Sequence, residues 1–268
     1  MAGEPDDVDA MVEPVVPSRH RWLAGLLAAA PGDRVADLGC GTGGSLAQAA
    51  PSVAGGLLAG LDLSAAALAR TAEAVGEAVA GLTPRPAVLC VQADLKAPLP
   101  LADGAFDRVL CHNVLEVLPD PDALVAEAIR VLRPGGRLVL AHSDFDTLIF
   151  ASEDLELTRR LVRDYCDTQQ PWMDAVDGTI GRRLADIAGR AGLVVEDVQA
   201  AVVLGRRFVP GEIGWGYARN LADTLGGDGR ATPAELERWL AGLQRLDDRG
   251  AFLFSVNDYA VICGRMPR

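Results

Sequence analysis

Positive charge is scarce in this sequence. Lys96 is its one lysine, and 25 basic residues stand against 37 acidic ones, giving a formal net charge of −12. A chain this acidic is repelled by phosphate backbones unless it carries a local basic patch. The densest basic segments, at 159–163 and 205–207, are interpreted as solvated faces. We therefore expect no nucleic-acid partner.

Long apolar runs and metal-binding motifs are also lacking. No segment approaches the ~20 apolar residues of a transmembrane helix, and the acidic N-terminus lacks the basic and apolar regions of a signal peptide. The five cysteines include no CxxC pair, and no His or carboxylate cluster has metal-ligand spacing. We expect a cytoplasmic protein with no bound metal and no membrane association, and a flexible tail over residues 1–17.

Half of the residues are apolar, which is enough for a large core. Through the first two-thirds of the chain, short apolar runs alternate with helical patterns, as is typical of βαβ units in a mostly parallel sheet. Nearly continuous apolar runs predict strands that are covered on both faces. The predicted strands lie at 34–38, 56–64, 86–95, 137–145 and the start of 106–118, and the predicted helices at 18–30, 64–79 and 120–132.

The strand–helix rhythm changes after Asp146. A charge-rich segment with a helical pattern reaches about residue 178. A helix is predicted at about 179–191, and a strand from Leu193 to about Leu204. Two helical stretches follow between 211 and 247, and 251–265 holds one long strand or a strand pair. We predict one α/β domain over 18–268, a Rossmann-like doubly wound sheet with a helical lid inserted after the fifth strand. The lid elements, about 146–178 and 205–250, are expected over the carboxyl edge of the sheet.

The segment Val35–Gly44 (VADLGCGTGG) is the most informative part of the chain. Glycines at a strand-to-helix turn let the backbone approach a ligand closely. A GxGxG pattern alone is weak, since a dinucleotide loop or a plain tight turn has it too. Asp37 adds weight, because dinucleotide folds usually have an apolar residue there and a carboxylate suits a cationic amino group.

Two further acids end the next two strands. Asp62 is placed to accept both ribose hydroxyls of a nucleoside, as in NAD enzymes. Asp94 is placed to accept from an adenine amino group, with Leu95 against the ring. Three acids with no basic residue among them favour a nucleoside without phosphate, whereas NAD or ATP would call for a helix N-terminus and often a basic side chain. The pattern favours S-adenosylmethionine.

Five motifs in order resemble the class I S-adenosylmethionine-dependent methyltransferases, in the group that includes the ubiquinone and menaquinone enzymes. They are the glycine motif at 34–44, the ribose strand at 56–64, the adenine turn at 92–94, the fourth-strand motif at 106–120 and the helix–turn–strand motif at 130–140. The resemblance covers about residues 20–145. It implies a seven-stranded sheet whose last strand is antiparallel, with 251–264 placed to supply that strand.

The resemblance also implies which residues hold the cofactor, with S-adenosylhomocysteine as the product. The cofactor residues are expected to be Asp37, Gly39, Cys40, Gly41, Gly43, Asp62, Leu63, Asp94, Leu95, Cys111, His112 and Asn113. One position departs from the family: many relatives have His where this chain has Val117, and some are thought to use that His near the acceptor. A mechanism that depends on it does not carry over.

A sulfonium methyl is already electrophilic, so a general base is needed only for an acceptor that is protonated and weakly acidic. His142, after the fifth strand, and His112, at the end of the fourth, are the candidates for catalysis or acceptor positioning. His142 could equally hold its loop through backbone hydrogen bonds. His20 is expected to be structural.

The acceptor site is predicted from residues near the lid. Asp144 could bind a cationic acceptor or cap the next helix, and Phe145, Trp172 and Trp215 could enclose a flat or apolar one or simply form the core of the lid. We predict methyl transfer to O, N or C of a small organic molecule in specialised or cofactor biosynthesis, by a monomer or homodimer. An NAD-dependent oxidoreductase and a non-catalytic nucleoside-binding protein of the same fold are the alternatives.

Overall fold

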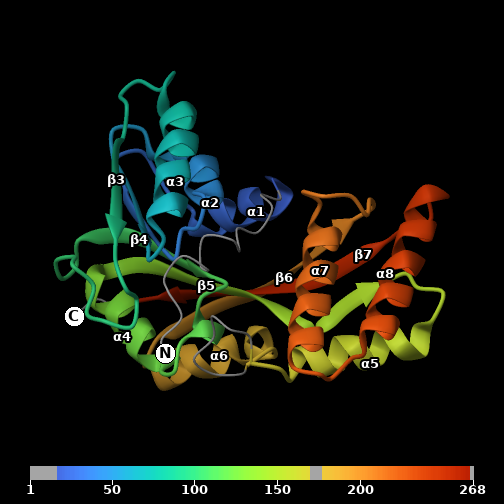
Figure 1. Cartoon of the computed structure of the whole chain (residues 1–268). Helices are drawn as coiled ribbons and strands as arrows, with labels where there is room; N and C mark the ends of the chain where they lie inside the picture. The colour runs from blue at the N-terminus through green and yellow to red at the C-terminus, as the bar shows by residue number, and fades with distance from the viewer. Residues whose placement is uncertain (1–16, 170–176, 266–268) are drawn as a thin grey trace.

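The computed structural model describes residues 17–169 and 177–265 (Figure 1). One sheet runs through the molecule. Its strands are β1 (Arg34–Leu38), β2 (Leu57–Asp62), β3 (Ala87–Gln92), β4 (Phe106–His112), β5 (Leu132–Phe150), β6 (Val194–Gly205) and β7 (Phe254–Gly264). The helices are α1 (Pro17–Leu27), α2 (Gly44–Ala49), α3 (Ala65–Val79), α4 (Pro121–Val131), α5 (Leu155–Cys166), α6 (Ile180–Arg190), α7 (Ile213–Gly227) and α8 (Pro233–Asp248).

The sheet has the strand order β3-β2-β1-β4-β5-β7-β6. Strands β1 to β5 are parallel, and β7 runs antiparallel between β5 and β6. The predicted seven-stranded, mostly parallel, doubly wound sheet is thereby confirmed. After β1 the chain continues to β2 on one side of the sheet, and after β4 it continues to β5 on the other side, so the strand order reverses between β1 and β4. Ligands of such sheets bind at this switch point, outside the carboxyl ends of the strands.

Helices cover both faces of the sheet. On one face α1, α2 and α3 pack in a core that includes Leu23, Leu46 and Val75, and on the other face α4 and α6 pack in a core that includes Leu124 and Leu184. The central strands are buried on both sides, as their continuous apolar runs predict. The prediction is wrong for β3, whose side chains are mostly exposed because it is an edge strand.

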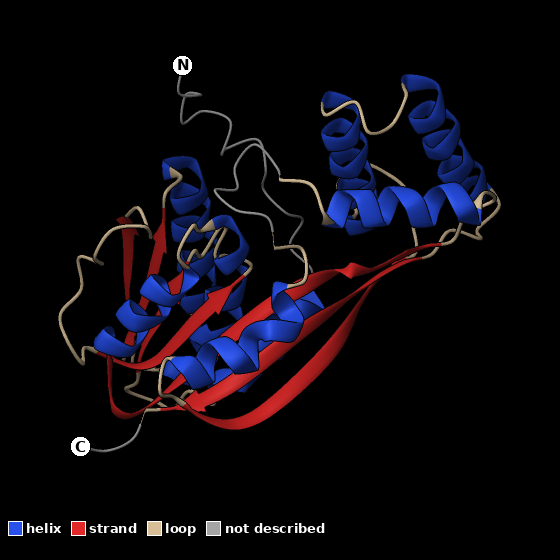
Figure 2. Cartoon of the chain, turned by 90° about the horizontal axis from the view of Figure 1, so that it is seen from below, coloured by secondary structure: helices blue, strands red, loops and turns tan. Residues whose placement is uncertain are grey.

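Strand β5 is longer than predicted. It continues past residue 145 to Phe150, which pairs with Phe254 of β7, so residues 146–150 belong to the strand and not to a lid. The strands β5, β7 and β6 thus extend to one side of the molecule, where α5, α7 and α8 gather (Figures 1 and 2). These three helices share a separate apolar core with the strand ends, including Phe150, Leu221 and Leu243. Both predicted lid segments therefore contribute to one helical cluster at the carboxyl end of β5.

None of the helices in the described parts of the chain is both long and apolar enough to cross a membrane.

Candidate cofactor and acceptor site

The turn after β1 is built on glycines in the left-handed region. Gly39 has φ +79°, and a Cβ there would lie 2.3 Å from a Val114 methyl carbon, so no side chain fits. Gly41 has φ +53°, and a Cβ at this position would meet nothing within 4 Å. The backbone N–H groups of Gly39 and Cys40 donate to the Leu61 carbonyl at 2.8 and 2.9 Å, which fixes the loop on β2. The loop therefore presents bare backbone to open space.

Asp62, at the end of β2, lies directly beside this loop. Its Oδ2 accepts from the Gly41 N–H at 2.8 Å and its Oδ1 from the Ser64 N–H at 2.9 Å. The side chain is half-buried. A carboxylate has about four lone-pair sites, so both oxygens can still accept from the hydroxyls of a ligand.

Asp37 is buried at the carboxyl end of β1. Burial, and then the nearby Asp62 charge, raise the pKa of Asp37 from 3.8 to about 7. No hydrogen bond or ion pair joins it to another residue of the described ranges. A buried carboxyl without a cation suits a ligand that brings one, because an ammonium group would favour the ionised form. The residues present thus fit a nucleoside that carries an amino-acid moiety.

The ends of β2 and β3 supply apolar and acidic groups next to the loop. Leu95 approaches Gly39, with its Cδ1 3.6 Å from the position of a Gly39 Cβ, and Leu63 is largely exposed. Asp94 is exposed and accepts from the Lys96 N–H at 2.9 Å. The two leucines could contact the faces of a planar ring, and the exposed carboxylate could accept from an exocyclic amine on that ring.

Three of the predicted cofactor residues turn their side chains elsewhere or have none to offer. The Cys40 thiol packs against Thr71 at 3.6 Å, and burial raises its pKa above the ordinary range. Cys111 lies in the sheet core, where burial likewise raises its pKa. Gly43, with φ +78°, precedes α2 and touches Thr71. At these positions only the backbone is available to a ligand.

At the end of β4, Asn113 and His112 face the neighbouring strand ends. Asn113 has φ +52°, and its Oδ1 accepts from the Ser143 N–H at 2.9 Å. The His112 ring is nearly buried. Burial and the nearby Arg19 charge hold its pKa well below the ordinary value, so this imidazole is neutral at neutral pH.

His142 is fully buried and bonded at both ring nitrogens. Its Nε2 bonds the Glu116 carboxylate, and its Nδ1 bonds the Ser143 carbonyl at 2.6 Å. Both partners are acceptors, so both ring nitrogens donate and the ring is an imidazolium. Burial opposes this charge, but Glu116, the Ser143 carbonyl and the nearby Asp258 charge together raise the pKa of His142. A ring in this state has no lone pair to accept a proton, which favours the loop-holding alternative.

Sequence reasoning missed the charged network behind this edge. Arg19 of α1 pairs with the buried Asp258 of β7 at 2.7 Å, and Ser143 Oγ lies 2.6 Å from the same carboxylate. The His112 Nε2 lies 4.0 Å from Asp258. A signal was present, because Asp258 is the one charged residue of the mostly apolar strand β7, but its partner is 239 positions away.

The structure gives two of the predicted acceptor residues other partners. Asp144 is fully buried and receives two hydrogen bonds from Arg182 of α6, at 2.6 and 2.7 Å. Phe145 packs in the core of the helical cluster, with ring centroids 5.8 Å from Tyr165 and 6.0 Å from Tyr217. Trp172 lies outside the described residues.

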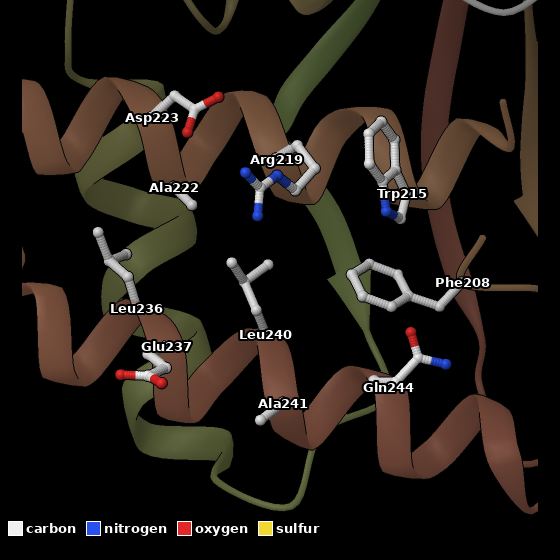
Figure 3. A pocket seen from close by; sticks show the side chains of 10 residues that line it. All are labelled: Phe208, Trp215, Arg219, Ala222, Asp223, Leu236, Glu237, Leu240, Ala241 and Gln244. Atoms are coloured by element: carbon white, nitrogen blue, oxygen red, sulfur yellow. The ribbon is translucent and has the colours of Figure 1, made fainter. Parts of the chain in front are cut away.

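Trp215 lies in a pocket of about 530 Å³ between α7 and α8 (Figure 3). Phe208, Leu236 and Leu240 form its apolar wall, and the Arg219 guanidinium sits 6.0 Å from the Trp215 ring. Tyr217, two residues on, instead points to the sheet, with its hydroxyl 3.5 Å from Ser143 Oγ. Trp215 therefore lines a different side of α7 from the one that meets the strand ends.

Comparisons with known proteins agree with this geometry. A methyltransferase-domain family matches residues 36–140. The chain is 34% identical over 242 residues to an uncharacterized 37.1 kDa protein in transposon TN4556 of Streptomyces fradiae, across 90% of this chain and 65% of that protein. It is 32% identical over 188 residues to the ubiquinone biosynthesis O-methyltransferase of Thiobacillus denitrificans, across 68% of this chain and 73% of that enzyme.

A solved structure with a similar fold is the geranyl diphosphate C-methyltransferase of Streptomyces coelicolor, in complex with Mg²⁺, geranyl diphosphate and S-adenosyl-L-homocysteine. It has a TM-score of 0.53 and 17% identity, and the match covers 93% of this chain and 79% of that one. The chain spans slightly less than two thirds of the Streptomyces fradiae relative and nearly three quarters of the Thiobacillus enzyme.

Proposed function

Because this chain belongs to the class I S-adenosylmethionine-dependent methyltransferases, in the group of the ubiquinone and menaquinone enzymes, we propose that it transfers a methyl group from S-adenosylmethionine to a small organic acceptor. The observation that carries the proposal is the contact between Asp62 and the glycine loop. The Asp62 carboxylate, which can accept from hydroxyl groups, lies 2.8 Å from the Gly41 N–H of the open turn, at the switch point of the sheet.

In this proposal three carboxyl groups hold one ligand. Asp37 faces the cationic amino group, Asp62 accepts from the ribose hydroxyls, and Asp94 accepts from the adenine amino group. Leu63 and Leu95 contact the faces of the adenine ring, and the backbone at Gly39 and Gly41 lies against the amino-acid moiety. The solved structure with S-adenosyl-L-homocysteine supports this choice of ligand through its fold.

When bound, S-adenosylmethionine supplies an activated methyl group on a sulfonium. The protein then has to align the acceptor with that bond and exclude water. His112 is neutral, and its Nε2 has no hydrogen-bond partner among the described residues, so of the two candidates it is the one that can contact an acceptor. Its lowered pKa makes it a weak proton acceptor, so its proposed role is to position the acceptor. His142 already carries its proton, so it positions the loop by holding Glu116 and Ser143.

The small acceptor is inferred from charge and from the rings near Ser143. A net charge of −12 disfavours nucleic-acid substrates, and Tyr217 brings an aromatic ring to the end of β5. The names of the ubiquinone biosynthesis relative and of the C-methyltransferase support methylation at O or C. Specialised or cofactor biosynthesis in the cytoplasm is part of the proposal.

Calorimetric titration of the purified protein with S-adenosylmethionine, S-adenosylhomocysteine and NAD tests the class. We expect binding of the first two and none of NAD, because the site offers no cation to a pyrophosphate. Binding of NAD alone would establish the oxidoreductase alternative. Binding of the first two without turnover of any acceptor would favour the non-catalytic alternative.

The variant Asp62→Ala tests the placement of the ligand. It removes hydrogen bonds to a charged acceptor, so we expect affinity for S-adenosylhomocysteine to fall by roughly 1–3 kcal/mol. Asp122→Ala, on the surface of α4, is the matched control and should bind normally. Unchanged affinity in Asp62→Ala would contradict the ribose assignment.

A further inference from the structure

Strand β6 is an edge strand with an open outer side. It pairs with β7 on one side, and it ends the strand order of the sheet, so no strand of the described ranges pairs with its other side. Of its 12 residues only Val203 and Gly205 are buried. A long edge strand with unpaired N–H and C=O groups is a template for pairing with another chain.

Three large apolar side chains in the middle and second half of β6 are exposed and lie on one face of the sheet. Val198 is 53% exposed, Val202 60% and Leu204 58%. Val198 pairs with Val261 of β7, whose side chain lies in the core beneath α6, so Val198 points to the same face of the sheet as α6. Side chains alternate along a strand, so Val202 and Leu204 point to this face too. Figure 2 views the sheet from this side and shows the strands bare of helices beyond α6.

A neighbouring strand enlarges this apolar surface. Ile149 of β5, 57% exposed, is level with Ser255 of β7, which is in turn level with Leu204. We call Ile149, Val198, Val202 and Leu204 the open sheet face. Three of these side chains lie on β6 and one on β5, with Ser255 of β7 between Ile149 and Leu204, and each is more than half exposed. Exposed apolar side chains gathered on one face in this way are typical of an interface.

The charges along β6 indicate which partner fits. Asp197 stands near the start of the strand, and Arg206 directly follows its end. Asp197 accepts from the Val198 N–H and from the Gln199 side-chain amide, both at 2.8 Å, and within the described part of the chain neither Asp197 nor Arg206 has an ion-pair partner. In an antiparallel pair of two identical strands, Asp197 of each copy would lie near Arg206 of the other, at both ends of the contact. This complementarity also offsets the repulsion that a net charge of −12 imposes between two copies.

We propose that β6 pairs antiparallel with β6 of a second copy of this chain, about a two-fold axis near Ala201. This register sets Val198 opposite Leu204, Ala200 opposite Val202, and Asp197 next to Arg206. Opposite residues of an antiparallel pair share a face, so the side chains of each opposed pair contact each other across the joint and cover part of their exposed apolar surface. A two-fold contact of this kind is self-complementary and closes as a dimer. The proposal does not depend on the proposed function.

Sedimentation analysis and light scattering across a dilution series test the dimer directly. We expect a species of twice the 28.1 kDa of one chain that dissociates on dilution. A mass of one chain at all concentrations would overturn the proposal, as would a series of larger aggregates without a discrete dimer.

The double variant Val198→Lys/Val202→Lys tests the strand. Lysine is tolerated on edge strands and blocks their pairing, so we expect a folded monomer with an unchanged circular dichroism spectrum. Leu89→Lys is the control, because it places an exposed lysine on β3, the opposite edge of the sheet. A dimer that survives the β6 variant, or that is lost in the β3 control, would contradict the assignment.

A charge exchange tests the register. Asp197→Arg and Arg206→Asp should each weaken dimerisation at least about tenfold, because each places like charges together. The double exchange should restore it, since the opposite charges meet again. Failure of the double variant to recover would rule out the antiparallel register centred near Ala201.

Discussion

At the scale of single residues, burial disfavours the charged form of both Asp37 and His142, but only His142 has partners that compensate. His142 is buried against Glu116 and keeps its charge. Asp37 is buried without a cation, and its pKa rises to about 7. Nothing within the described residues favours its ionised form. A carboxyl group kept in so unfavourable a state is typical of binding sites, where a ligand supplies the missing charge.

The Asp37 pKa leads to a prediction about stability. The folded state holds this proton at pH values where the unfolded chain has lost it, so the group's contribution to stability falls as pH rises from 3.8 to about 7. Asp37→Asn removes the buried charge. We expect it to raise the free energy of unfolding by on the order of 1–3 kcal/mol at about pH 8, and much less at about pH 5. Denaturant unfolding at both pH values measures this.

Asp94→Asn is the control for Asp37→Asn, because Asp94 is exposed. It should change stability little at either pH. A gain for Asp37→Asn that is equal at both pH values would mean that the carboxyl is not protonated in the folded state. Binding of S-adenosylhomocysteine should weaken in the same variant, in keeping with the proposed function.

At the scale of elements, local chemistry decides where the helices begin. Ser64 caps α3 by accepting from the Ala67 N–H, as the sequence predicts, and Asp120 caps α4 in the same way. Helix α8 has a full capping box, in which Thr232 accepts from the Glu235 N–H and Glu235 accepts from the Thr232 N–H. These bonds satisfy donors that the first turn leaves open.

The capping box of α8 predicts the cost of removing it. Thr232→Ala should lower the free energy of unfolding by about 1 kcal/mol, because the Glu235 N–H loses the side-chain oxygen that accepts from it. Thr179→Ala is a matched control: Thr179 holds the same position before α6, but its side chain makes no cap hydrogen bond. Thermal unfolding of both variants compares them. An equal loss in both would show that the box does not stabilise α8.

At the scale of the whole molecule, the chain has a cofactor half and a helical end. Two cores flank the sheet, and a third joins α5, α7 and α8 to the tips of β5 and β7. The β5–β7 register is irregular between Asp144 and Ile149, where the strands pass from one region to the other. Within the third core, Trp239 of α8 donates to Thr158 of α5 at 2.9 Å.

This division predicts the pattern of amide hydrogen exchange. We expect the amides of α5, α7 and α8 to open together as one unit, at lower free energy than those of β1 and β4, because these helices pack only at the strand tips. S-adenosylhomocysteine should protect the β1 and β2 region and leave the helical cluster less affected. Exchange of α5 independently of α7 and α8 would contradict a single cluster.

The parallel strands, the glycine turn and the capped helices could all be predicted from the sequence, because each depends on residues close together in the chain. The periodicity of apolar residues predicts the elements and the mostly parallel sheet. Asp62 follows the same logic: it ends a predicted strand, and the carboxyl ends of parallel strands meet at one edge of the sheet. The grouping of Asp62 with the glycine turn at this edge was therefore open to prediction.

The acceptor side was not, because its contacts join residues far apart in the sequence. His142 was a candidate base until tertiary structure gave it Glu116, and Asp144 a candidate ligand until it met Arg182. Arg19 and Asp258 lie 239 positions apart, and no periodicity links them. The sequence by itself determined the fold class and the glycine turn beside Asp62. Only the tertiary structure decided which polar side chains are already paired inside the protein and which face a ligand, because that depends on the packing of distant elements.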